Sequence, residues 1–304
     1  MEKLEAGLQS RPGNELAGLE GRTELLTRLA KALGNNEEFF GKDGRPGNMI
    51  GGYPIPPAPV RPGTNVYTDH LLSHPSTQAS SMLIVPLPVL WNVLMTGLAS
   101  IWPPSRTSVN GVSLGDAWPC KAMPKAGSAS WESILPFHKL TQWLTYSLMQ
   151  PMQSLLNMHF AGTELLTGLP EYRNGGLFVD MGVLTLKPND VERGLQHYAE
   201  YSRRTGSKGI EVAPMFEPGD DVVVEWRGAT VGLLDKLLEE VNKFLKAELA
   251  GNEMTLPQLL EAGSWKVSAR IVQPSRQCMA RLTETRAAAR LPRFTARIQR
   301  SRRF

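Results

Sequence analysis

Cysteine is almost absent from this chain of 304 residues, which contains only Cys120 and Cys278. Two cysteines cannot form the disulfide framework that stabilises many small secreted domains. The first residues include Glu2, Lys3 and Glu5 and lack the apolar run of a secretory signal. These absences predict a cytoplasmic protein.

Long uninterrupted apolar runs are also missing. The longest apolar stretch, residues 82–102, is interrupted by Pro86, Pro88, Asn92 and Gly97. A membrane-spanning helix needs about 20 consecutive apolar residues. This stretch is therefore expected to be a buried helix, and no contact with a membrane is predicted.

The sequence lacks the short motifs that bind nucleotides or catalytic zinc. It contains no G-x-x-x-x-G-K-[ST], no G-x-G-x-x-G after a strand and no H-E-x-x-H. His70 and His74 have the spacing of two metal ligands on a helix, but Pro75 ends any helix there. Because no neighbouring Cys or acidic residue supplies a third ligand, we expect neither a metal nor a cofactor.

Basic residues are concentrated at one end of the chain. Residues 266–304 contain eleven Lys and Arg residues and one acidic residue, Glu284. Because the whole chain carries +4, residues 1–265 carry −6. A basic arm can bind nucleic acid or an anionic membrane, but this one has only Phe294 and Phe304 as aromatic residues and no recognisable binding motif. We predict no nucleic-acid partner and a disordered tail over residues 266–304.

Hydrophobic periodicity in residues 1–265 is helical rather than strand-like. Helices are expected at residues 22–33, 87–98, 131–160 with a kink at Pro151, 172–184, 189–202, 220–248 and 255–262. Alternation of the strand type does not persist for more than about five residues. The sequence therefore predicts an all-α fold with a single helical domain over residues 1–265.

The helix expected after Pro136 has two contrasting sides when residues are placed at about 100° intervals. Four apolar residues share one side and are expected to be buried: Phe137, Leu140, Leu144 and Leu148. Four polar residues share the opposite side: His138, Lys139, Gln142 and Tyr146. Such groups are typical of a pocket wall that recognises a ligand. The alternative is a half-exposed amphipathic helix whose Gln and Tyr side chains cap neighbouring backbone groups.

A charged triplet lies between turn residues in the sequence PEYRNGG, residues 170–176, and Asp180 follows in an apolar run. A carboxylate beside an Arg at a helix start is held ionised by the cation and by the helix dipole. Glu171 is therefore a candidate charged group in a pocket. The alternative is a structural role, in which Glu171 caps the helix and forms an ion pair.

Five strings occur in an order that resembles one family. They are GLEGR at residues 18–22, RPGN at 45–48, SLGDAW at 113–118, PFHKLTQWL at 136–144 and PEYRNGG at 170–176. Over about residues 10–266 the chain resembles the fungal and bacterial uracil catabolism protein 4 family, a domain of unknown function. The resemblance implies a cytosolic role in the degradation of uracil through ribosylated urea intermediates.

The chain departs from that family in three places. It begins almost at the GLEGR string, so the family's long N-terminal half is expected to be missing. Residues 50–68 are expected to be an inserted loop. The resemblance ends after Trp265 and Lys266, so the basic tail is expected to lie outside the family. Loss of part of the pocket would leave the shortened chain inactive.

A weaker resemblance links two of the strings to the queuosine salvage proteins, which hydrolyse the N-glycosidic bond of a nucleotide. Those proteins also have a Pro-Phe-aromatic-Lys-x-x-Gln helix and an acid-Tyr-Arg triplet, although their acid is Asp where this chain has Glu171. The resemblance implies a helical fold of the queuosine-salvage glycosidase type. It also implies N-glycosidase activity on a ribosyl-urea or another nucleotide-derived small molecule.

Cleavage of an N-glycosidic bond needs a carboxylate near the anomeric carbon and a proton for the leaving nitrogen. The candidate catalytic residues are Glu171, Asp180 and His138. The candidate substrate-binding residues are Lys139, Gln142, Tyr146, Tyr172, Arg173 and Asp116. Two alternatives remain, an amidohydrolase that cleaves the urea moiety and a non-catalytic partner of a uracil-degradation enzyme. The sequence does not indicate an oligomeric state.

Overall fold

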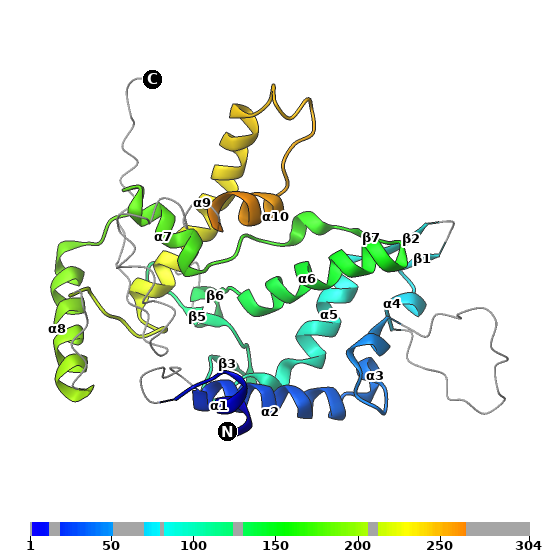
Figure 1. The fold of residues 1–304 in the computed structure, drawn as a ribbon, viewed down its shortest axis with the longest axis horizontal. Coiled ribbons are helices and arrows are strands. Elements are labelled where there is room, and N and C mark those ends of the chain that lie inside the picture. The colour runs from blue at the N-terminus through cyan, green and yellow to red at the C-terminus, as the bar shows by residue number, and fades with distance from the viewer. Residues whose placement is uncertain are drawn as a thin grey trace. The chain divides into compact units, whose positions relative to one another are not determined.

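The computed structural model describes residues 2–11, 19–50, 70–79, 82–123, 130–205 and 212–265. The predicted basic tail and nearly all of the predicted loop at residues 50–68 lie outside these ranges. The chain divides into two compact units (Figure 1). Unit 1 contains the described residues within Glu20–Gly115 and Leu140–Leu166, and unit 2 contains those within Glu2–Leu19, Asp116–Lys139 and 167–265.

Unit 1 consists of helices and short strands. Its helices are α2 (Leu19–Asn35), α3 (Glu37–Phe40), α4 (His70–Ser73), α5 (Leu87–Gly97), nearly all of α6 (Lys139–Leu156), and the 3-10 helices η1 (Pro46–Met49), η2 (Ala99–Ile101) and η4 (Thr163–Leu165). One sheet has the order β1 (Gln78–Ala79), β2 (Leu83–Pro86) and β7 (Met158–Ala161). A separate hairpin consists of β3 (Ser108–Val109) and β4 (Val112–Ser113).

The core of unit 1 is built around α5, which follows β2 without a loop. β1 pairs antiparallel with β2, and β2 pairs parallel with β7 in a register that places Leu83 opposite Met158. Buried apolar residues of α5, such as Leu90 and Val93, belong to the same core cluster as Val85 of β2 and Met158 of β7. The sheet β1-β2-β7 and helix α5 therefore contribute to one continuous apolar core.

The face of α6 that is buried differs from the predicted one. Its buried residues are Thr141, Gln142, Thr145, Met149 and Met152, whereas Leu140 is 40% exposed. Of the predicted stripe, Phe137 is buried but lies before the helix, and Leu144 and Leu148 are half-buried. The Thr145 hydroxyl donates to the backbone carbonyl of Thr141 at 2.8 Å. Threonine can therefore lie on the buried face, because its hydroxyl is satisfied within the helix.

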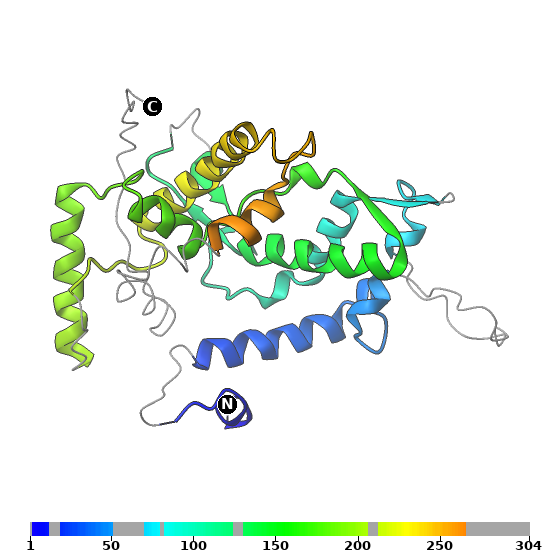
Figure 2. The same ribbon diagram turned by 45° about the horizontal axis from the view of Figure 1, so that its top comes forward.

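Unit 2 contains helices and one short hairpin. Its helices are α1 (Glu2–Gly7), α7 (Tyr172–Asp180), α8 (Pro188–Thr205), α9 (Asp221–Phe244), α10 (Leu256–Gln258), the 3-10 helix η3 (Ser130–Ser133) and the π-helix η5 (Leu259–Trp265). β5 (Ala117–Pro119) pairs antiparallel with β6 (Ile134–Pro136). α7 and α10 both contact α9, the longest of these helices (Figures 1 and 2).

The start of α7 is fixed between α9 and η5. Trp226 Nε1 of α9 donates to the carbonyl oxygen of Gly175 at 3.3 Å, and a Cβ at Gly175 would lie 2.2 Å from the Trp226 ring. Asn174, which is fully buried, donates to the carbonyl oxygen of Leu169 at 2.7 Å and accepts from the Ser264 hydroxyl at 2.6 Å. These contacts hold the N-terminal turn of α7 in one position.

The prediction of an all-α fold is wrong, because the described residues also form one three-stranded and two two-stranded sheets. The fold is mixed α/β. Each strand is two to four residues long, too short for alternation of side chains to be visible in the sequence. β6 and all but the last residue of β7 fall within residues 131–160, which were predicted to be helical. The backbone leaves the helical region at His138 and Asn157, where φ is 44° and 50°.

The longer predicted helices are confirmed, since α2, α5, α7, α8 and α9 lie at the expected places in the sequence. Asp220 caps α9 through its side chain, which accepts a hydrogen bond from the backbone N–H of Val222. Among the described residues, no helix is both long enough and apolar enough to cross a membrane.

Candidate functional site

Asp116 lies immediately before β5 and is the centre of a largely buried polar cluster in unit 2. Its carboxylate accepts hydrogen bonds from both Nη atoms of Arg227, at 2.8 and 2.7 Å. Trp118 Nε1 donates to Asp116 Oδ1 at 2.7 Å, and the backbone N–H of Lys139 donates to Oδ2 at 3.0 Å. The paired side chains of Asp116 and Arg227 are only 12% and 13% exposed.

The hydrogen bonds to Asp116 determine its charge. Burial by itself would raise the pKa of this carboxyl group, but the hydrogen bonds and charge of Arg227, with the donors of Trp118 and Lys139, lower it to about 2. Asp116 is therefore ionised at neutral pH and bonded to fixed donors. Such a carboxylate is suited to holding chain segments in place rather than to exchanging a proton.

Arg227, on α9, joins three segments of unit 2 that are distant in sequence. Besides Asp116, it reaches the turn before α7, where its Nε donates to the carbonyl oxygen of Pro170 at 3.3 Å. Its guanidinium also lies over the ring of Phe137, 4.1 Å from the ring centroid. Arg227 is not among the site residues predicted from the sequence. The available signal is a single cation within the apolar first half of α9, close to the buried Trp226.

The same aspartate holds the turn that precedes α6. Its backbone carbonyl accepts hydrogen bonds from the N–H groups of Phe137 and His138, both at 2.9 Å. His138 has a φ of 44°, in the left-handed region that residues with a Cβ rarely adopt. Burial lowers the pKa of its imidazole, against the opposing charge of Asp116. Burial therefore favours the neutral form of the His138 ring.

Lys139 lies among charged groups at the first residue of α6. Burial lowers the pKa of its ammonium group, the charge of Glu171 opposes this change, and the charge of Arg227 adds to it. The charges of Asp116 and Arg173 also act on Lys139. Lys139, Glu171, Arg173, Asp116 and Arg227 therefore form one charged cluster near the start of α6 and the start of α7.

Glu171 is the N-cap of α7 and is only 9% exposed. Its Oε1 accepts a hydrogen bond from the backbone N–H of Asn174 at 3.3 Å. The carboxylate therefore caps the helix, which is the first part of the structural alternative predicted from the sequence. The charge of Glu171 also acts on Lys139. A carboxylate that caps a helix can therefore still interact with a neighbouring charged group.

The other predicted residues of α7 occupy different positions. Arg173 is exposed, and its Nε donates to the hydroxyl of Tyr172 at 3.0 Å while its guanidinium lies 5.6 Å from that ring's centroid. Asp180 is the last residue of α7 and lies roughly 13 Å from Glu171 along the helix, at 1.5 Å per residue. Burial raises the pKa of Asp180. Asp180 is therefore not brought to the end of α7 that carries Glu171.

Gln142 and Tyr146 belong to unit 1. Gln142 is buried and lines a cavity of about 160 Å³ with the apolar side chains of Leu87, Pro88, Trp91, Leu165 and Leu166. Tyr146 packs against the core of the same unit. Unit 2 thus brings together six of the predicted residues at the two helix starts: Asp116, His138, Lys139, Glu171, Tyr172 and Arg173.

The described residues contain no group of three or more His, Cys, Asp and Glu side chains arranged to hold a metal ion. His70 and His74 lie near each other in unit 1, with ring centroids 6.1 Å apart. The His70 ring also packs edge to face against the Phe39 ring, with the ring centroids 4.9 Å apart. This contact gives His70 a packing role.

Two curated proteins are similar to this chain. It is 42% identical over 274 residues to "Uracil catabolism protein 4" of Lachancea kluyveri, a match that covers 89% of this chain and 56% of that protein. It is 44% identical over 271 residues to "Protein urg3" of Schizosaccharomyces pombe, covering 89% and 53% respectively. The chain therefore spans about half the length of the curated relatives it matches. No solved structure matches it.

The family match covers most of the chain. Residues 1–281 match the family described as "Protein of unknown function (DUF1688)", so the match includes the first part of the basic segment after Trp265. Together with the two relatives, it confirms the resemblance that the five sequence strings indicated. The chain belongs to this family of proteins of unknown function.

Proposed function

We propose that this chain takes part in uracil catabolism by hydrolysing the N-glycosidic bond of a ribosyl-urea intermediate. The name of the Lachancea kluyveri relative supports the pathway. The charged cluster of unit 2 supports the reaction. The observation that carries the proposal is the buried carboxylate of Glu171, held at the N-terminus of α7, with its charge acting on Lys139.

Glu171 is the carboxylate that faces the sugar. Cleavage of the bond between the anomeric carbon and nitrogen develops positive charge on the ribose ring, which a fixed carboxylate stabilises. The backbone N–H of Asn174 holds Glu171, and Asn174 is itself held by Leu169 and Ser264. A carboxylate anchored in this way does not need to reorganise as the charge develops.

His138 takes part in the proton transfers. Water forms a bond to the anomeric carbon as the bond to nitrogen breaks, and the proton that the water loses passes to the neutral imidazole. The imidazolium then gives this proton to the leaving nitrogen, so the products are ribose and urea and the ring is neutral again. The lowered pKa of His138 supports this role, because a protonated ring could not act as a base.

Lys139 and Arg173 bind the phosphate or hydroxyl groups of the substrate. Both side chains carry donors, and the exposed Arg173 is oriented by Tyr172. Asp116 and Arg227 do not need to contact the substrate in this arrangement. They hold the residues that precede α6 and α7, and so position His138 and Glu171.

The test is an incubation of the chain with ribosylurea and with its 5′-phosphate, followed by measurement of the free sugar, urea and ammonia. Urea is expected in equal amount with ribose from the first substrate and with ribose 5-phosphate from the second. Ammonia released in place of urea would contradict the proposal and favour an amidohydrolase. Retention of a pathway enzyme without turnover of either compound would favour a non-catalytic partner. The same assay on the full-length Lachancea kluyveri relative tests the reaction in a longer chain, of which the match covers 56%.

A further inference from the structure

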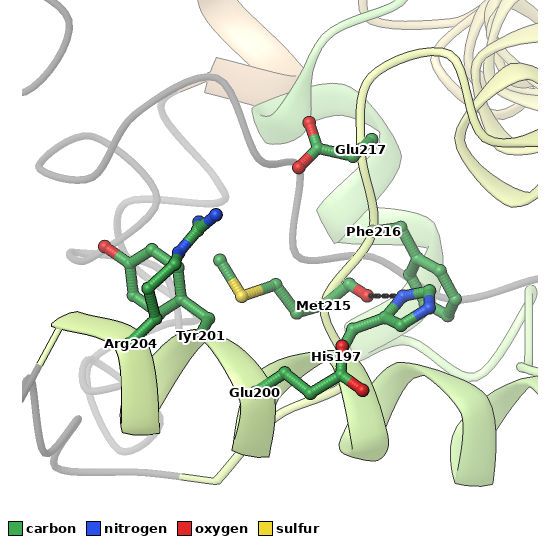
Figure 3. Close-up of a pocket in the computed structure, with 7 residues that line it drawn as sticks. All are labelled: His197, Glu200, Tyr201, Arg204, Met215, Phe216 and Glu217. Carbon is green, nitrogen blue, oxygen red and sulfur yellow. Dashed lines mark hydrogen bonds between the residues drawn. The ribbon is translucent and has the colours of Figure 1, made fainter.

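A second cavity lies in unit 2, lined by residues outside the cluster described above. α8 contributes His197, Glu200, Tyr201 and Arg204, whose spacing places them on one face of the helix. Residues 215–217 line the other side. The cavity between them has a volume of about 330 Å³ and is open to solvent (Figure 3).

The wall opposite α8 is fastened to that helix. The backbone N–H of Met215 donates to the carbonyl oxygen of Gly194 at 2.9 Å, and Nδ1 of His197 hydrogen-bonds to the carbonyl oxygen of Met215 at 3.0 Å. A Cβ at Gly194 would lie 2.6 Å from Cβ of Pro214, so glycine permits this close approach. The cavity is therefore formed before any ligand binds.

The aromatic residue beside Met215 strengthens this wall. Phe216 is only 1% exposed, and the guanidinium of Arg193 lies 4.8 Å from its ring centroid. Arg193 donates two hydrogen bonds to the carboxylate of Asp220, at 2.6 and 2.9 Å, and two to Asp190. A ligand that enters the cavity does not have to order this wall, which lowers the free-energy cost of binding.

Three charged side chains line the cavity: Glu200, Arg204 and Glu217. In the part of the chain that the structure describes, none of the three forms an ion pair, unlike Arg193 on the same helix. In Figure 3, Glu200 and Glu217 lie on either side of the Met215 side chain. Two carboxylates and one guanidinium therefore surround a partly apolar space.

We infer that this cavity binds a small zwitterion, a free amino acid of the α or ω type. Its ammonium group would pair with Glu200, the carboxylate on the α8 side of the Met215 side chain. Its carboxylate would pair with Arg204, whose planar guanidinium suits a bidentate contact. The thioether of Met215 would contact the aliphatic part of the ligand. The excess of negative charge disfavours phosphates and nucleotides.

The inference is independent of the proposed glycosidase activity, since the two sites share no residue. It is tested by calorimetric titration of the whole chain with glycine, 4-aminobutyrate and 6-aminohexanoate, which separate the two charges by increasing lengths. Butylamine and butyrate are the matched ligands that each lack one charge. At least one amino acid is expected to bind at least about tenfold more tightly than either of them.

Substitutions on α8 assign the binding to this cavity. The amino acid is expected to bind more tightly than butylamine, and Arg204→Gln should remove this difference in affinity. Arg203→Gln, at an exposed neighbour outside the cavity, should preserve it. Glu200→Gln should weaken the binding of the amino acid and of butylamine to the same extent. Its control is Glu192→Gln, at an exposed position of the same helix. Equal affinity for all ligands, no binding at about 10 mM, or equal loss in a control variant would overturn the inference.

Discussion

The two charged regions of unit 2 differ in how their charges are satisfied. At the Asp116 cluster, a largely buried carboxylate receives two hydrogen bonds from Arg227 and further donors from Trp118 and Lys139. At the α8 cavity, the exposed Glu200, Arg204 and Glu217 line the space without forming ion pairs among the described residues. In the first region, groups of the protein pair with the charges. In the second region, the charged side chains can interact with water or with a ligand.

This difference separates a positioning role from a binding role. A buried charge is costly unless it is paired, so Asp116 and Arg227 must hold their geometry, and that geometry fixes the turns before α6 and α7. Exposed charges are solvated and cost little when they are unpaired. They can exchange water for a ligand without disturbing the fold. Substitutions should therefore affect stability at the first region and ligand binding at the second.

The largest effect is expected from Arg227→Met, which leaves Asp116 as a largely buried charge without its cation. Loss of one partner from such a pair lowers the free energy of unfolding by about 4 kcal/mol. Urea denaturation followed by circular dichroism measures it. The double variant with Asp116→Asn should regain part of the loss, because the remaining buried charge is removed. A single variant as stable as the original chain would contradict the buried pairing.

Glu171→Gln is expected to affect catalysis more than folding. The amide keeps the shape of the side chain and an acceptor for the N–H of Asn174, but it removes the charge that, in the proposed reaction, faces the developing oxocarbenium ion. Turnover of the ribosyl-urea should fall by roughly 10², with a much smaller change in KM. Glu192→Gln, an exposed carboxylate of α8, is the control. Full turnover in folded Glu171→Gln protein would remove Glu171 from the mechanism.

The sequence predicts the long helices but not the strands. α2, α8 and α9 repeat apolar residues at helical spacing over several turns, so periodicity alone locates them. β6 and β7 are three and four residues long and continue the apolar composition of α6 on either side. Their identity depends on pairing with β5 and β2, which is a tertiary property.

The residues of the candidate site were also predicted only in part. Glu171 at a helix start and the polar residues after Pro136 are local features, and they are visible in the sequence. Arg227 is not, because its partners Asp116 and Pro170 are 111 and 57 residues away. The buried face of α6 was misassigned because Thr141 and Thr145 count as polar although the helix backbone satisfies the hydroxyl of Thr145.

A pH series sharpens the comparison at Asp116. Its pKa is 3.8 in an unfolded chain and about 2 in the folded one, so the carboxylate stabilises the fold above pH 4. That contribution is lost as the pH falls from about 4 to about 2 and amounts to about 2 kcal/mol. The stability difference between the original chain and Asp116→Asn should therefore shrink by this amount between pH 6 and pH 2. A constant difference across the series would show that Asp116 does not titrate in this way.

The smallest effect is expected at the α8 cavity, where Glu217→Ala should change the free energy of unfolding by less than about 0.5 kcal/mol. Glu217 is exposed and forms no ion pair among the described residues, so its removal deletes no stabilising contact of the fold. Asp220→Ala, three residues later, is the matched variant. Asp220 pairs with Arg193 and caps α9, so its loss should lower stability by about 1 to 2 kcal/mol. Equal losses in the two variants would mean that Glu217 is held by the protein, and its charge would then not be available to a ligand.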